Sequence, residues 1–169
     1  SITNLKMAAS AGRACIIGAT GHDSTQRAEI ISMSKIVPVV FSSNMSVGVN
    51  TMWRLIAEAV KMLGKKYQID IVETHHVHKK DKPSGTAKKM IEIVTEKGGY
   101  ELNKNLLVTS IREGEVVGDH TIIFTNPNER LEITHHAFSR EAFANGALRA
   151  AEWIVDKKPG LYDMADVLK

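Results

Sequence analysis

The chain has 169 residues, of which 43% are hydrophobic and 24% charged, a composition typical of a folded globular protein and not of a disordered one. The formal net charge is +3 and the lysines are dispersed except in HKKDK, so we expect no nucleic acid partner. The longest apolar runs, such as IVPVVF, are too short to cross a membrane. The one cysteine, Cys15, lies in an apolar run, which indicates a core thiol in a reducing compartment.

Residues 1–43 show the order strand, helix, strand. An apolar run at 12–17 stops at Gly18, DSTQRAEIISMS has helical spacing, and KIVPVVFSSN is a second β-branched run, so we predict a β-α-β piece of a larger parallel sheet. The turn IIGATGH is weaker than a G-x-G-x-x-G fingerprint and, taken alone, indicates only a turn. Together with FSSNMS after the next strand, it places small residues at two strand ends, where ligands bind in open α/β sheets.

The middle of the chain predicts a helix, a strand, a loop and a second helix. A long amphipathic helix begins near Ser46, with apolar residues at Val49, Met52, Trp53, Ile56, Val60 and Leu63. YQIDIVET then alternates in polarity, as a half-buried strand does. After a loop rich in histidine and lysine, Ser84 stands at an N-cap position, and apolar residues recur at helical spacing until Gly98.

The last third predicts three strands and a helix. The runs LLVTSIRE, VVGDHTIIFT and RLEITHHAF complete an open mixed sheet of about four strands. A helix follows from Ser139, and its predicted apolar face comprises Ala144, Ala147, Leu148, Ala151, Ile154 and Val155. Pro159 and Gly160 end this helix and leave a tail. The predicted fold class is therefore α/β, with a partial Rossmann-like parallel sheet and a mixed sheet with flanking helices.

The stretch PSGTA places backbone amides at a helix start, where they can bind an anion such as a carboxylate. The same pattern is also that of an ordinary serine N-cap. Just before it, three histidines and Lys79 lie within five residues, which favours a proton-donating site at neutral pH. A histidine metal site is the competing interpretation, but it lacks a third ligand and has lysines beside it.

Arg149 lies off the predicted apolar face of the last helix. Exposure to solvent is the simpler interpretation. The alternative is contact with a second carboxylate of a substrate, which suits a guanidinium group.

ETHHVHKKDKPSGTA closely resembles the signature E-x-H-H-x-x-K-x-D-x-P-S-G-T-A of the dihydrodipicolinate reductase (4-hydroxy-tetrahydrodipicolinate reductase) family. The similarity continues in order through IGATG, NMSVGVN, SIREGEVVGDHTIIF, ERLEITHHAFSREAFANGALRAAEWI and GLYDMADVL. The resemblance implies an oxidoreductase of lysine and diaminopimelate biosynthesis, which transfers hydride from NADPH or NADH to a cyclic unsaturated dicarboxylate.

The resemblance also implies roles for individual residues. By motif position, His75 is the proton donor and Lys79 its catalytic partner, His76 contacts the substrate, and a substrate carboxylate is held by Ser84, Gly85 and Thr86. Two loops match those that line the nicotinamide in the family: Gly18, Ala19 and Thr20, and then Ser42, Ser43, Asn44 and Met45. No resident metal is implied.

The family's architecture implies a division of the chain into three parts. Residues 1–43 would be the C-terminal part of the dinucleotide-binding domain, 44–149 the substrate-binding and tetramerisation domain, and 150–169 a tail returning to the first domain. The glycine-rich phosphate loop of the family would lie before Ser1, so the resemblance implies that this chain lacks the N-terminal part of that domain. Family members are usually homotetramers, located in the cytoplasm or, in plants, the plastid stroma. A second hypothesis is a non-catalytic dicarboxylate-binding or assembly fragment of such a reductase.

Overall fold

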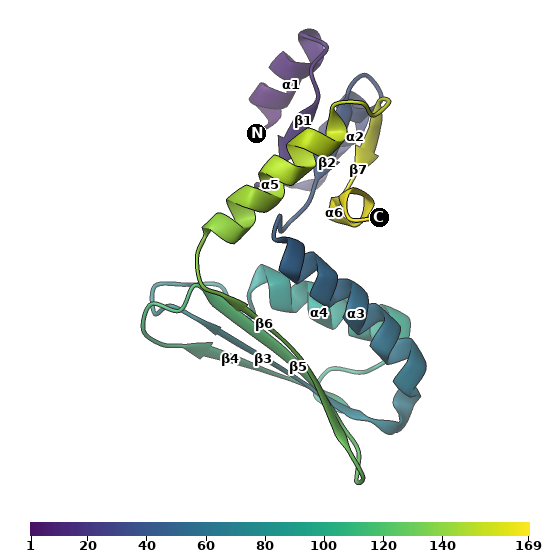
Figure 1. Cartoon of the computed structure of the whole chain (residues 1–169), viewed down its shortest axis with the longest axis vertical. Coiled ribbons are helices and arrows are strands. Elements are labelled where there is room, and N and C mark those ends of the chain that lie inside the picture. Colours follow the sequence, from purple (N-terminus) through teal and green to yellow (C-terminus); the bar gives the residue numbers. More distant parts are fainter. The chain divides into compact units, whose positions relative to one another are not determined.

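The structure is a computed structural model that describes residues 1–169, and the chain folds as two compact units. The first unit comprises Ser1–Asn50 and Glu141–Lys169, and the second comprises Thr51–Arg140. The elements are α1 (Ile2–Ser10), β1 (Cys15–Ile17), α2 (Ser24–Ser34), β2 (Pro38–Phe41), α3 (Val47–Leu63), the 3-10 helix η1 (Gly64–Lys66), β3 (Gln68–His75), α4 (Gly85–Gly98), β4 (Leu106–Arg112), β5 (Gly118–Thr125), β6 (Arg130–Ala137), α5 (Glu141–Ile154), β7 (Gly160–Tyr162) and α6 (Met164–Val167) (Figure 1). None of the helices combines the length and apolarity that a membrane crossing needs.

The first unit is built on a three-stranded parallel sheet in the order β1-β2-β7. Successive residues of β2 point to opposite faces, so Val39 packs with Leu5 and Ile30 of the helices α1 and α2, whereas Val40 packs with residues of α5 and α6. Both faces of the sheet are therefore covered, which explains why β2 reads as a continuous apolar run and not as an alternating one.

The predicted parallel sheet is confirmed, but three elements of the first unit were not predicted. Helix α1 buries only Leu5, so its sequence carries a weak helical pattern. Strand β7 has three residues and pairs with β2, and α6 has four residues with a capping box at Asp163. Short elements like these are stabilised by neighbours distant in sequence, so local periodicity does not reveal them.

The second unit is a four-stranded mixed sheet in the order β4-β3-β5-β6, with β4 parallel to β3 and the other pairs antiparallel. Helices α3 and α4 lie on one face of this sheet, and the other face has no helix over it (Figure 1). Strand β3 alternates strictly, with Ile69, Ile71, Glu73 and His75 buried and the residues between them half-exposed. The predicted mixed sheet of four strands is thereby confirmed.

Helix α5 buries only part of the predicted apolar face, with Ile154 common to the predicted and the observed face. Gly146, Ala150 and Ile154 are buried, whereas Leu148 is 63% exposed and Val155 is 71% exposed. The reason is that a glycine, which carries no hydrophobic signal, lies at the closest contact of the helix with the chain segment around Met45. The whole helix belongs to the first compact unit.

Candidate active site

The candidate site lies on the helix-covered face of the sheet in the second unit, near the C-terminal end of β3. In the strand register, Glu73 lies opposite Ser110 of β4 and His120 of β5, and His75 lies opposite Arg112 of β4. Partners in register point to the same face of a sheet. The strand pairing therefore gathers ionisable side chains from three strands, far apart in sequence, into one cluster.

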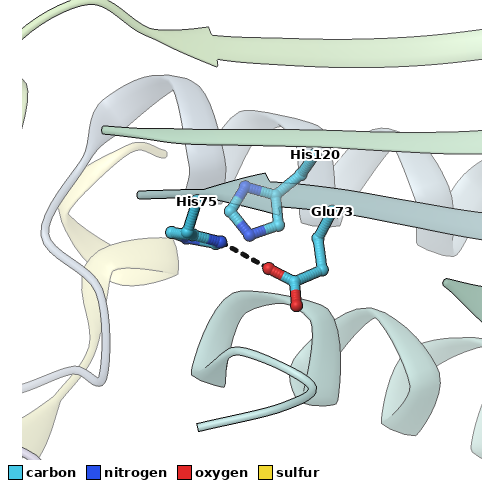
Figure 2. A group of neighbouring side chains, drawn as sticks. All are labelled: Glu73, His75 and His120. Carbon is cyan, nitrogen blue, oxygen red and sulfur yellow. Dashed lines mark ion pairs between the residues drawn. The ribbon is translucent and has the colours of Figure 1, made fainter. Parts of the chain in front are cut away.

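Glu73, His75 and His120 form the core of this cluster (Figure 2). The side chain of Glu73 is fully buried; its Oε2 contacts Nδ1 of His75, and its Oε1 lies 2.9 Å from Nη2 of Arg112. The imidazole rings of His75 and His120 meet edge to face with centroids 5.0 Å apart. The carboxylate thus has one cationic or polar partner on each oxygen, as a buried charge requires.

Burial and charge set the protonation of these groups. Burial opposes ionisation of Glu73, but Arg112, Ser110 and the charge on His75 together outweigh it and keep the pKa of Glu73 below its usual value. Burial lowers the pKa of His75, with Lys79 and Arg112 adding to the effect and Glu73 opposing it. Burial also lowers the pKa of His120 to about 3. At neutral pH the cluster holds an ionised Glu73 and a neutral His120.

The start of α4 lies against this cluster. Oγ of Ser84 accepts a hydrogen bond of 3.2 Å from the backbone N–H of Ala87 and lies 3.0 Å from Nε2 of His120. The predicted N-cap is confirmed, and the Ser84 hydroxyl is engaged within the protein. Gly85 is exposed, and a Cβ placed on it would meet no atom within 4 Å. Open space therefore reaches the backbone at the positive end of the helix, as an anion site requires.

The loop between β3 and α4 carries the remaining predicted residues. Lys79 is partly buried, and its Nζ lies 2.7 Å from Oδ1 of Asp81. His76 is half-buried and its ring lies 6.2 Å from that of the exposed His78. Arg112 donates hydrogen bonds to the backbone oxygens of Lys79, at 3.2 Å, and Asp81, at 2.5 Å. The loop is consequently held by an arginine from β4.

The metal alternative gains a third group in the structure. Glu73, His75 and His120 each offer a ligand atom, and these atoms lie within 4.8 Å of one another. However, Glu73 already forms an ion pair with Arg112, and the positive charge of Lys79 lies close enough to His75 to lower its pKa. These cations oppose a dication at the same place, so the donor set fits an ion-pair network better than a metal site.

The two predicted nicotinamide loops follow β1 and β2, which are adjacent parallel strands of the first unit. Gly18, Ala19 and Thr20 are exposed, and a Cβ on Gly18 would lie 3.3 Å from the side chain of Met45. The structure thus brings these two loops side by side at one edge of the sheet, where parallel strands end.

Hydrogen bonds fix the second of these loops. Oγ of Ser42 donates to the backbone oxygen of Asn44 at 2.9 Å, and Oδ1 of Asn44 accepts from the N–H of Ser46 at 2.8 Å. Asn50 binds two carbonyl groups of the same loop. Ser43 is exposed and Met45 is buried. Residues 42–46 therefore form a hydrogen-bonded turn that leads into α3, whose first residues complete the motif SSNMSVGVN.

Comparison with known proteins identifies the family. The family described as "Dihydrodipicolinate reductase, C-terminus" matches residues 48–168, and that described as "Dihydrodipicolinate reductase, N-terminus" matches residues 1–45. The chain belongs to the dihydrodipicolinate reductase family. It is 43% identical to the 4-hydroxy-tetrahydrodipicolinate reductase of Syntrophotalea carbinolica and 42% identical to that of Geotalea uraniireducens, covering 99% of this chain and 69% of each relative.

A solved structure agrees in fold. The dipicolinate-bound dihydrodipicolinate reductase from Paenisporosarcina sp. TG-14 superposes with a TM-score of 0.80 at 18% identity, over 96% of this chain and 67% of that protein. The predicted family, fold class and oxidoreductase function in lysine and diaminopimelate biosynthesis are thereby confirmed at the level of the family.

Three residues of the cluster were missed in the sequence. Glu73 stands at a core position of an alternating strand, and His120 and Arg112 likewise occupy inward positions of β5 and β4. A polar residue at a buried position of a strand is the signal that would have found Glu73 and His120. Arg149 is exposed in α5, as the simpler interpretation expected.

Proposed function

We propose that this chain carries the substrate-reducing site of a 4-hydroxy-tetrahydrodipicolinate reductase, with His75 as proton donor and Lys79 as its catalytic partner. The observation that supports this most directly is the cluster at the end of β3. There, a buried carboxylate contacts one ring nitrogen of His75, and the open helix start at Gly85 lies a few residues along the chain. A proton donor and an anion site are the two functions that reduction of an unsaturated dicarboxylate needs.

The dicarboxylate is the proposed substrate class. One carboxylate would bind at the first turn of α4, on the backbone of Gly85 and Thr86, with His76 as a further contact. The Ser84 side chain is engaged as N-cap and with His120, so Ser84 would act through its position and not by donating its hydroxyl to the substrate. Lys79 would exchange its pairing with Asp81 for a pairing with the bound anion.

NADPH or NADH is the proposed cofactor, and it would supply the hydride. The residues present fit a nicotinamide in two respects. The loop at Gly18, Ala19 and Thr20 is exposed and small, and the neighbouring loop from Ser42 to Met45 is rigidly hydrogen-bonded. Their backbone and small side chains would hold the ring in a fixed orientation.

The bare face of the four-stranded sheet is the proposed assembly surface. Leu107 and Ile111 of β4 are 47% and 37% exposed on strands whose other face is covered by helices. Exposed apolar side chains on an uncovered sheet favour burial against another copy, as in the homotetramer we propose. Sedimentation analysis tests this, because a charged residue in place of Leu107 should lower the oligomeric state. We also propose a cytoplasmic location, in keeping with the family's biosynthetic role, which cell fractionation tests.

Calorimetry with pyridine-2,6-dicarboxylate, the dipicolinate found in the solved reductase, tests the function of this chain. We expect the dicarboxylate to bind, and to bind more tightly when NADPH or NADH is present. Replacement of His75 by Gln should reduce turnover at least about a hundredfold with modest loss of binding. His78→Gln, an exposed histidine three positions along, is the control. If the dicarboxylate binds but neither NADPH nor NADH binds to the chain, the non-catalytic fragment is favoured instead.

A further inference from the structure

Glu73 is a charged residue at a position that would ordinarily be apolar. It follows Ile69 and Ile71 on the buried face of β3, and its side chain is 0% exposed. Buried ion pairs can often be replaced by apolar residues without loss of stability, so stability alone does not explain a carboxylate here. Its contacts indicate what else it does.

One carboxylate oxygen orients the imidazole of His75. Because Oε2 of Glu73 contacts Nδ1, the neutral ring carries its proton on that nitrogen, and Nε2 is the atom left to exchange a proton with a substrate. Nε2 lies over Gly118, where a Cβ would come within 3.0 Å of it. A glycine at this position keeps the approach to Nε2 free of side-chain atoms.

The other carboxylate oxygen is tied to the loop through Arg112. Nη2 of Arg112 lies 2.9 Å from Oε1 of Glu73, and the same guanidinium donates to the backbone oxygens of Lys79 and Asp81. One planar group therefore links the orienting carboxylate to the loop that carries the second catalytic residue. A lysine has a single donor atom and cannot span these three acceptors.

Charged or ionisable groups face His75 from its own strand, from both neighbouring strands and from the loop that follows β3. These are Glu73 on its own strand, Arg112 on β4, His120 on β5 and Lys79 in the loop. Arg112 and Lys79 favour the neutral ring, and the Glu73 carboxylate favours the protonated ring. Loss of Glu73 together with Arg112 therefore removes the ring's orientation while cancelling much of the change in charge.

We propose that Glu73 and Arg112 are positioning residues that hold His75 and the loop of residues 79–81 in one fixed arrangement. This inference rests on the proposed role of His75 as proton donor. Neither residue touches the substrate in this proposal: Glu73 acts through His75, and Arg112 acts through Glu73 and the loop backbone.

Two variants of the full chain test the proposal. Glu73→Met/Arg112→Met removes both partners, which leaves no unpaired buried charge and allows the chain to fold. Arg112→Lys keeps the charge but loses the three-way contact. The matched control is Glu58→Met/Lys61→Met, which removes an exposed ion pair from the outer side of α3. The unfolding temperature of each variant shows that the fold is retained.

The decisive readout is the tautomer of His75, measured from the nitrogen chemical shifts of its ring and assigned with His75→Gln. We expect the Nδ1–H form in the wild-type chain and a mixture of tautomers in the double Met variant. Turnover should fall at least about tenfold in both variants, mainly in kcat, because misplacement of about 1 Å is costly in an active site. The control should match the wild type in both measurements.

The outcomes separate this inference from the proposed function. If the double Met variant keeps the Nδ1–H tautomer and the wild-type kcat, Glu73 and Arg112 do not position His75 and the inference is wrong. If His75→Gln keeps full turnover, the proton-donor role is wrong, while the tautomer measurement still decides whether the carboxylate orients the ring. The nitrogen shifts require no turnover, so they apply whatever the activity of the chain.

Discussion

Gly146 of α5 lies directly against the backbone of Met45. A Cβ added there would lie 1.8 Å from the carbonyl oxygen of Met45. Ordinary carbon–oxygen contacts are about 3.3 Å, so Gly146→Ala requires the helix and the loop to separate by roughly 1.5 Å. The displaced segment is the loop proposed to line the nicotinamide.

The sign of the stability change distinguishes this close approach from simple helix propensity. Alanine is a better helix former than glycine by about 1 kcal/mol, which would stabilise an isolated helix. Overpacking a rigid backbone contact costs about 3 kcal/mol at the upper end of its usual range. We therefore expect a net loss of about 2 kcal/mol, or a fall in unfolding temperature of about 4–8 °C for a chain of this size.

Thermal unfolding followed by circular dichroism measures this difference. Asn145→Ala is the matched control, because Asn145 is the exposed neighbour in the same helix and its replacement should leave stability unchanged or slightly raised. Binding of the nicotinamide cofactor to Gly146→Ala should weaken along with stability. If Gly146→Ala proves as stable as the wild type or more stable, α5 does not approach the Met45 carbonyl as described, and the reasoning is refuted.

Three further predictions concern the second unit. Gly85→Ala should keep the unfolding temperature, because the new methyl group meets no protein atom within 4 Å. It should weaken pyridine-2,6-dicarboxylate binding at least about tenfold by calorimetry, since the methyl group fills the approach to the backbone N–H groups. Equal affinity in the variant and the wild type would argue against an anion site there. Between about pH 6.5 and about 3 the unfolded chain binds a proton at His120 that the folded chain does not. The free energy of unfolding should therefore fall by up to about 1.4 kcal/mol per pH unit as the pH decreases, and His120→Gln should reduce that slope in urea titrations. Finally, burial holds the pKa of His75 below its usual value, and two substrate carboxylates would raise it again, so dicarboxylate binding near pH 6.5, about the usual histidine value, should take up protons. Calorimetry in buffers of different ionisation enthalpy should show this uptake in the wild type and not in His75→Gln.

The sequence was sufficient for the elements whose burial follows a simple period. Strand β3 alternates between apolar and polar residues, and the N-cap residue Ser84 marks the start of α4, so both elements are predictable from local residues. The buried face of α5 was not, because it depends on Gly146, whose contribution is the absence of a side chain. A hydrophobic pattern indicates which side chains are buried, but it does not indicate where two backbone segments lie in direct contact.

The candidate site was predictable only in part for a similar reason. The residues of the loop and helix start lie within one short stretch, and their chemistry is visible in their types and spacing. The partners of Glu73 come from β4 and β5, and their proximity depends on strand register. Register is set by the whole sheet, so the short stretch alone does not reveal which residue neutralises Glu73.

The parallel pairing of β3 with β4 joins two motifs that are separate in sequence. Residues 73–87 supply the histidines, Lys79 and the helix start, while SIRE supplies Arg112. A fully buried carboxylate without its arginine would favour the protonated, neutral form, and would then stabilise an imidazolium poorly. The ionisation of Glu73, and through it the orientation of His75, therefore depends on a strand that begins some thirty residues later. The two motifs constitute a single site, and a substitution at Arg112 should resemble one at Glu73 more closely than one at any residue of its own strand.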